Sequence, residues 1–189
     1  MNIKRKTKIL SIFTLGIIFL NIFIGAYSNN LPQTIKVTTE KSKLYTIKYE
    51  NFYINAKNIK SDNENIILYC LEIDKGYPTG QNFKLSGDAE KEISSIIAAG
   101  YPSKTPEELN LENESQAYFA TQLAIWSYIE DYDVDKMISE NINIVNAIRQ
   151  IYSEGLSYSH PVRTINKVYI SDNNSIQELV AIFYPAQLG

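Results

Sequence analysis

The chain contains a single cysteine, Cys70, and a single histidine, His160. A zinc site built from Cys and His needs three or four such ligands, and a disulfide framework needs an even, dense set of cysteines. Neither can be built here, so a hydrophobic core must hold the fold, and we expect no metal and no other cofactor. The net charge of −3 lacks the basic footprint of a duplex-binding domain. We therefore expect no nucleic-acid partner.

The first 28 residues have the pattern of an export signal. Four basic residues fall within residues 1–8, and residues 9–26 form an almost unbroken apolar run. Ala26 and Ser28 are small residues that suit cleavage after Ser28, with cleavage after Ala26 as one alternative and a retained membrane anchor as another. We predict a signal peptide at 1–28 and an exported mature protein outside the membrane. Its removal takes away four basic and no acidic residues, which changes the net charge from −3 to −7.

The remaining chain, residues 29–189, has a length that suits one domain burying roughly 70% of the surface of its unfolded chain. We predict a polar lead-in at 29–43 and the domain itself at 44–189. In an exported protein, one unpaired cysteine must bond to another chain, be buried as a small apolar side chain, or react chemically. The surroundings of Cys70 must decide among these three.

Residues 66–73 predict an interior strand that covers this cysteine. Leu68 and Cys70 point to one face and Tyr69 and Leu71 to the other, so both faces are apolar as far as Leu71. Before it, the Tyr- and Ile-rich residues 44–55 predict a strand and residues 58–65 a polar turn.

The middle of the chain changes to helical periodicity. The first helix is expected at 88–99, with Ser86 or Asp88 as its N-cap and Gly100 followed by Tyr101-Pro102 as its stop. The other elements that we predict are an acidic loop at 103–112, a helix at 115–130 with a capping box at Asn113 and Gln116, a helix at 134–154 in one or two pieces with a break near 141–143, and strands at 164–170 and 177–184. Strands, then helices, then strands predict an α+β fold.

Gln122 is the unusual residue of the 115–130 helix. It follows Phe119 by three residues and precedes Trp126 by four, so it shares the covered face with both aromatic side chains. A buried carboxamide needs hydrogen-bond partners, and backbone groups at a sheet–helix interface would supply them. Taken singly, Gln122 is then a structural residue and Cys70 a small core residue.

Together, the segments around these two residues resemble the thioester domains of Gram-positive surface adhesins. Residues 121–126, TQLAIW, fit the TQxA(I/V)W signature of that family, and the Tyr-Cys-Leu of residues 69–71 fits its aromatic-Cys-aliphatic signature, with Gln122 following Cys70 by 52 positions. The Gly-Tyr-Pro at 100–102 is a further family feature. The resemblance spans residues 44–184, and its motif residues are Tyr69, Leu71, Thr121, Ala124 and Trp126.

The resemblance implies an internal thioester. Cys70 would attack the side-chain carbonyl of Gln122 and expel ammonia, and an amine, typically a Lys of a host surface or matrix protein, would then replace the sulfur in a stable amide bond. The domain would act once, so it would not be an enzyme. The implied fold is an antiparallel sheet or barrel portion packed against a helical portion, with the thioester bridging a strand and a helix, and the implied location is the bacterial cell wall or the medium.

Three aromatic side chains, Tyr69, Phe119 and Trp126, are candidates for keeping water away from the thioester. No residue motif identifies which group moves the protons, and none of the 14 tyrosines can be singled out from the sequence. We expect a monomer, and because no wall-sorting motif or stalk of repeated domains is present, we expect further domains to follow or the domain to be released.

Two other functions fit parts of the sequence. A secreted cysteine hydrolase or transferase could use Cys70, His160 and Asp172, which occur in the chain order of a Cys/His/acid triad. Against it, cysteine nucleophiles usually lie at a helix N-terminus or beside a cation, and Cys70 is predicted inside a strand. A non-covalent binding module with an inert cysteine is the second alternative.

Overall fold

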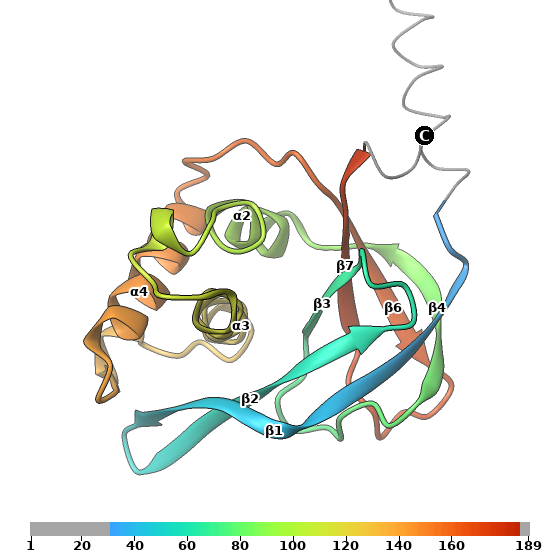
Figure 1. Ribbon diagram of the computed structural model, residues 1–189, viewed down its shortest axis with the longest axis horizontal. Helices are drawn as coiled ribbons and strands as arrows, with labels where there is room; N and C mark the ends of the chain where they lie inside the picture. The colour runs from blue at the N-terminus through green and yellow to red at the C-terminus, as the bar shows by residue number, and fades with distance from the viewer. Residues whose placement is uncertain (1–30, 186–189) are drawn as a thin grey trace, which may run out of the picture. The chain divides into compact units, whose positions relative to one another are not determined.

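The computed structural model describes residues 31–185, and the predicted signal peptide lies outside these residues. Residues 33–184 form one compact unit of α+β architecture, with a seven-stranded antiparallel sheet and three α-helices among the described residues (Figure 1). This confirms the predicted fold class. Within the described part of the chain, no helix is both long enough and apolar enough to span a bilayer.

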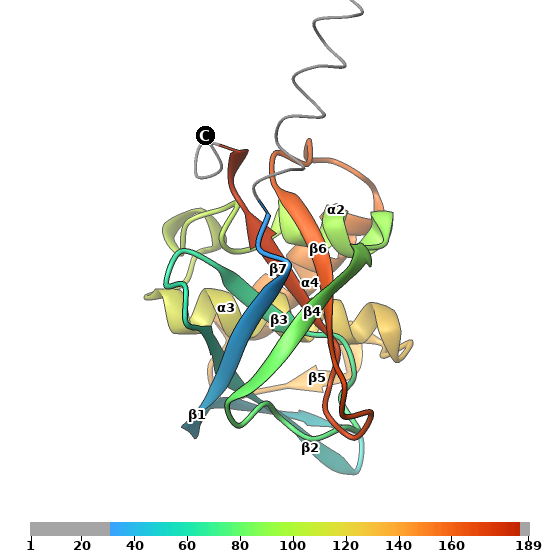
Figure 2. The same cartoon turned by 90° about the vertical axis from the view of Figure 1, so that its right-hand side faces the viewer.

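Six of the strands close into a barrel. Each of them pairs with two neighbours in the ring β1-β2-β3-β7-β6-β4, and the short β5 pairs with the end of β1. Figure 2 shows β1, β4 and β6 side by side on the wall that faces away from the helices. The strands are β1 (Thr34–Tyr49), β2 (Phe52–Ser61), β3 (Ile67–Cys70), β4 (Gln81–Asp88), β5 (Met137–Ile138), β6 (Ile165–Ser171) and β7 (Leu179–Phe183).

The helices pack against the β2–β3 side of this barrel. They are α2 (Lys91–Ala99), α3 (Glu114–Ile129) and α4 (Ile142–Leu156), with short 3-10 helices at Glu107–Leu109 and Val134–Lys136. In Figure 1, α3 is enclosed by α2, α4 and the strands. Every side chain of α3 from residue 116 to residue 127 is buried, which is why its sequence is apolar almost all round and not only along one stripe.

The N-terminal part of β1 differs from the sequence prediction. The strand begins at Thr34, so most of the predicted lead-in at 29–43 is strand. The predicted strand at 44–55 instead contains the end of β1, a turn at Glu50 and Asn51, and the start of β2. The prediction failed because residues 38–46 are paired with β2 but have no side chain in the core, so no apolar alternation marks them.

Most of the predicted helix boundaries are confirmed to within a few residues. Asn113 caps α3 by accepting a hydrogen bond from the Gln116 N–H at 3.0 Å, and Gly100 ends α2. The predicted break near 141–143 is real, because Asn141 caps α4 there. The start of α2 was predicted too early: Asp88 is the last residue of β4, and the N-cap is Glu90, which makes no capping hydrogen bond through its side chain.

Close packing of α4 against α2 predicts the effect of a small substitution. A Cβ atom at Gly155 would lie 2.7 Å from the Ile96 Cα, a backbone atom that cannot rotate away. We expect Gly155→Ala to lower the free energy of unfolding by about 1–3 kcal/mol through overpacking, measured by urea denaturation. Gly87→Ala, where a Cβ meets nothing within 4 Å, is the matched control. Equal stability of the two variants would contradict the prediction.

Candidate functional site

The site lies where β2 and β3 separate. These strands pair at one position only, Lys60 with Ile67, whereas β3 pairs with β7 along its whole length. Beyond Ile67, the edge of β3 that faces β2 therefore has backbone polar groups without a strand partner. Buried groups of this kind must find other hydrogen-bond partners, and side chains of α3 provide them.

Gln122 bonds both backbone polar groups of Cys70. The Cys70 N–H donates to Gln122 Oε1 at 2.8 Å, and Gln122 Nε2 donates to the Cys70 carbonyl oxygen at 2.9 Å. Each residue is only 1% exposed. The glutamine amide thus occupies the position that the backbone of an adjacent strand would take, and the predicted pair is brought together in the interior.

Tyr118 bridges the same seam one helical turn earlier. Its hydroxyl donates to the Leu68 carbonyl oxygen at 2.7 Å, and the backbone of Ile59 on β2 bonds the same hydroxyl. Its ring stacks on Tyr69 with 4.7 Å between centroids. Tyr118 belongs to no motif in the sequence, although its position four residues before Gln122 places it on the same face of the helix.

The first residue of the TQ motif is joined to the Gly-Tyr-Pro segment. Thr121 Oγ1 accepts from the Tyr101 N–H and donates to the Ala117 carbonyl oxygen, both at 2.9 Å. A Cβ atom at Gly100 would lie 2.5 Å from Thr121 Oγ1, so this approach requires glycine. The Tyr69 hydroxyl donates to the Tyr101 carbonyl oxygen at 2.7 Å. One contact region therefore links two motifs that are distant in the sequence.

The remaining motif residues are buried around this pair. Leu71 follows Cys70 at the end of β3, and Phe119, Ala124 and Trp126 lie on α3. The ring of Phe119 contacts Tyr45 at 5.6 Å between centroids. The indole Nε1 of Trp126 has no hydrogen-bond partner among residues 31–185, so the tryptophan contributes apolar contact.

The electrostatics of the site keep its thiol protonated. Burial raises the pKa of Cys70 well above its ordinary value, because the thiolate would lose its hydration. Burial also raises the pKa of Tyr69 and Tyr118 and that of the part-buried Tyr77. These phenols are therefore neutral, and any reaction at Cys70 must depend on the position of the thiol and not on a preformed thiolate.

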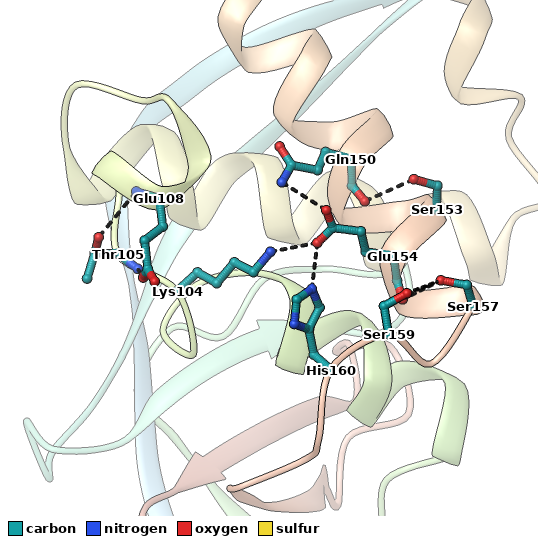
Figure 3. Close-up of polar contacts among 9 residues, drawn as sticks. All are labelled: Lys104, Thr105, Glu108, Gln150, Ser153, Glu154, Ser157, Ser159 and His160. Carbon is teal, nitrogen blue, oxygen red and sulfur yellow. Dashed lines mark hydrogen bonds and ion pairs between the residues drawn. The ribbon is translucent and has the colours of Figure 1, made fainter.

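The Cys/His/acid triad of the hydrolase alternative is not assembled. Nε2 of His160 lies 2.7 Å from Glu154 Oε2, which also accepts a hydrogen bond from Lys104 at 2.6 Å (Figure 3). Asp172 bonds Lys84 at 2.7 and 2.9 Å. The imidazole and the carboxylate are thus engaged in separate surface contacts, while Cys70 is buried against Gln122. Among residues 31–185, no group of three or more His, Cys, Asp or Glu side chains could hold a metal ion.

Within this barrel-and-helix fold, a buried strand cysteine and a helix glutamine are paired through the backbone of the cysteine. The thioester-domain family model matches residues 67–157, which include β3, α3 and both candidate residues. By this match, residues 67–157 have the sequence pattern of a thioester domain.

Solved structures share this fold. The Bacillus anthracis TIE protein matches with a TM-score of 0.61 and 23% identity over 71% of this chain, which spans only 26% of the length of that protein. The N-terminal thioester domain of the fibronectin-binding protein SfbI from Streptococcus pyogenes matches with a TM-score of 0.57 and 18% identity, over 79% of this chain and 93% of the other. The N-terminal domain of the S. pyogenes pilus tip adhesin Cpa gives 0.57 and 16%, over 82% and 95%. A search of curated proteins found no match.

The cluster around Glu154 predicts a pH-dependent contribution to stability. Burial would raise the pKa of this carboxyl, but hydrogen bonds from Lys104, His160 and Gln150 outweigh it and lower the pKa below its ordinary value. Because the folded-state pKa is depressed, the stabilisation is complete above the unfolded-state value of about 4.3 and is lost as pH falls through the folded-state value. We expect Glu154→Gln to lower the free energy of unfolding by about 1 kcal/mol at pH 7, since the group is partly exposed.

The measurement is thermal or urea unfolding of both proteins between pH 7 and pH 3.5. The difference between wild type and Glu154→Gln should shrink as the pH falls. Glu140→Gln, at an exposed carboxylate on the loop before α4, is the control and should show no such trend. A difference that grows towards acid would refute the assignment.

Proposed function

We propose that this is an adhesin domain, exported to the bacterial cell surface, that forms a thioester between Cys70 and Gln122 and captures a Lys amine of a host surface or matrix protein. The observation that carries the proposal is the pair of hydrogen bonds between the Gln122 amide and the Cys70 backbone. These bonds hold the side-chain carbonyl of Gln122, which the thiol would attack, next to Cys70.

In this proposal, thioester formation depends on the two hydrogen bonds between Gln122 and the Cys70 backbone and on the fixed position of the thiol. The Cys70 N–H, 2.8 Å from Gln122 Oε1, polarises the carbonyl and stabilises the negative charge that develops on this oxygen in the tetrahedral intermediate. The bond from Nε2 to the Cys70 carbonyl fixes the plane of the amide. As the sulfur–carbon bond forms and the carbon–nitrogen bond breaks, the thiol proton leaves with the amide nitrogen as ammonia. Fixed positioning replaces a bimolecular encounter, which compensates for a protonated thiol.

The same groups serve the second step. An amine attacks the Gln122 carbonyl carbon, the carbon–sulfur bond breaks, and the sulfur takes up the proton that the amine gives up. The Cys70 N–H can again stabilise the oxyanion. The product is an amide that joins the two proteins covalently, so in this proposal each molecule captures one partner and has no turnover.

Several observations support this function. The family match covers both reacting residues, and two proteins of the same fold are described as a fibronectin-binding protein and a pilus tip adhesin. The predicted signal peptide supports export. Tyr69, Phe119 and Trp126 are each at most 1% exposed, which supports their predicted role in excluding water. The domain acts as a monomer in this proposal, because the reacting pair is complete within one chain.

Intact mass spectrometry tests the proposal. Freshly purified mature protein should be lighter than its sequence mass by one ammonia, because that molecule leaves when the thioester forms. Methylamine should then add to it. Both effects should disappear in Cys70→Ala and in Gln122→Ala, while circular dichroism shows that these variants are folded.

His160→Ala is the matched control and should retain the thioester and the methylamine adduct, because His160 contacts Glu154 and not Cys70. Wild-type protein with its full sequence mass and no adduct would refute the thioester and leave the non-covalent binding module.

A further inference from the structure

A pocket of about 340 Å³ opens at the seam between β2 and β3, beside the N-terminal end of α3. Leu44, Ile59 and Ile67 give it apolar walls, and Tyr101 and Tyr118 line it as well. Its volume lies at the lower end of the range for small-ligand sites, which suits one extended side chain. The pocket lies where the single Lys60–Ile67 pairing ends the contact between the two strands.

Tyr118 connects this pocket with the strand and the helix that carry the reacting pair. It lines the pocket, and its hydroxyl bonds the Leu68 carbonyl two residues before Cys70. It also precedes Gln122 by one helical turn on the same face. Because Cys70 and Gln122 are only 1% exposed, an incoming amine must displace a side chain, and Tyr118 is the one that the pocket reaches.

The charges at the pocket are predominantly negative. Glu64 and Glu114 line it with exposed carboxylates, and neither forms an ion pair within residues 31–185, whereas the pocket's cation, Lys60, pairs with Glu40. After burial, the carboxylate of Glu114 helps to raise the pKa of Tyr101 to about 12. The positive end of α3 contributes only about half a charge here, so the two carboxylates exceed it.

We propose that this pocket receives the side chain of the partner's lysine. The apolar walls contact its methylene groups, Glu64 and Glu114 attract its ammonium, and displacement of Tyr118 admits the amine to the Gln122 carbonyl. The ammonium first gives one proton to water, and the neutral amine then reacts as described above. This inference rests on the proposed thioester, and it assigns the selectivity of the reaction for cationic amines to this pocket.

The test compares two nucleophiles on the mature protein. Rates of adduct formation are measured by intact mass for Nα-acetyl-lysine amide, which is cationic, and for hydroxylamine, which is mostly uncharged near neutral pH. The charge-reversed double variant Glu64→Lys with Glu114→Lys should react with the lysine compound at least about fivefold more slowly, from the loss of two exposed attractions and their replacement by repulsion. Its rate with hydroxylamine should change less than about twofold.

The matched control is Glu130→Lys with Glu140→Lys, which changes the net charge equally at exposed positions that do not line the pocket. It should leave both rates unchanged. If the pocket variant and the control react with the lysine compound at the same rate while hydroxylamine adducts form normally, the inference is wrong. If neither nucleophile adds to wild-type protein, it is the proposed thioester that has failed.

A second variant tests the pocket by its shape. Ser115 lines it from the first turn of α3 and is exposed, so Ser115→Trp fills the pocket without disturbing the core. The lysine compound should then react several-fold more slowly, and the smaller hydroxylamine should be less affected. Unchanged rates for the lysine compound would overturn the pocket as its route of entry.

Discussion

The site depends on hydrogen bonds between side chains of one helix and the backbone of one strand. β2 leaves β3 after a single pairing, and buried backbone groups without partners would cost about 1–3 kcal/mol each. Gln122 and Tyr118, one turn apart on α3, bond Cys70 and Leu68, two residues apart on β3. The spacing of one turn along α3 thus matches the spacing of two residues along β3, and the hydrogen bonds at both positions fix where α3 lies against the barrel.

This arrangement also explains why the pair lies in a dry interior. A side-chain amide can replace a strand only where water does not compete for the same hydrogen bonds, so all of α3 from residue 116 to residue 127 is enclosed. The enclosure has opposite effects on the chemistry. It raises the pKa of the Cys70 thiol and so removes the thiolate, but it strengthens the bond from the Cys70 N–H to the Gln122 carbonyl. In the proposed reaction, positioning and carbonyl activation compensate for the weak nucleophile.

The contacts around the TQ motif show how the segments depend on one another. Thr121 is held by the backbone of Tyr101, and Gly100 leaves the space that this approach requires. Tyr69 bonds the same segment through its hydroxyl and stacks on Tyr118. Residues that look like separate motifs along the chain are therefore parts of one packed region, and each of them limits where Gln122 can lie.

The sequence by itself determined the local features whose causes are local. Alternation around Cys70 placed it in a covered strand, helical spacing placed Gln122 beside Phe119 and Trp126, and caps such as Asn113 and Gly100 marked helix ends. The resemblance to a family implied that Cys70 meets Gln122, but only the tertiary structure decided how these groups are held together, because that depends on pairing between strands far apart in the chain. The separation of β2 from β3, the bridging by Tyr118 and the surface contacts of His160 leave no periodic signal. The exposed half of β1 was missed for a related reason. Its backbone hydrogen bonds are made with β2, but its side chains are not buried, so its sequence shows no apolar alternation.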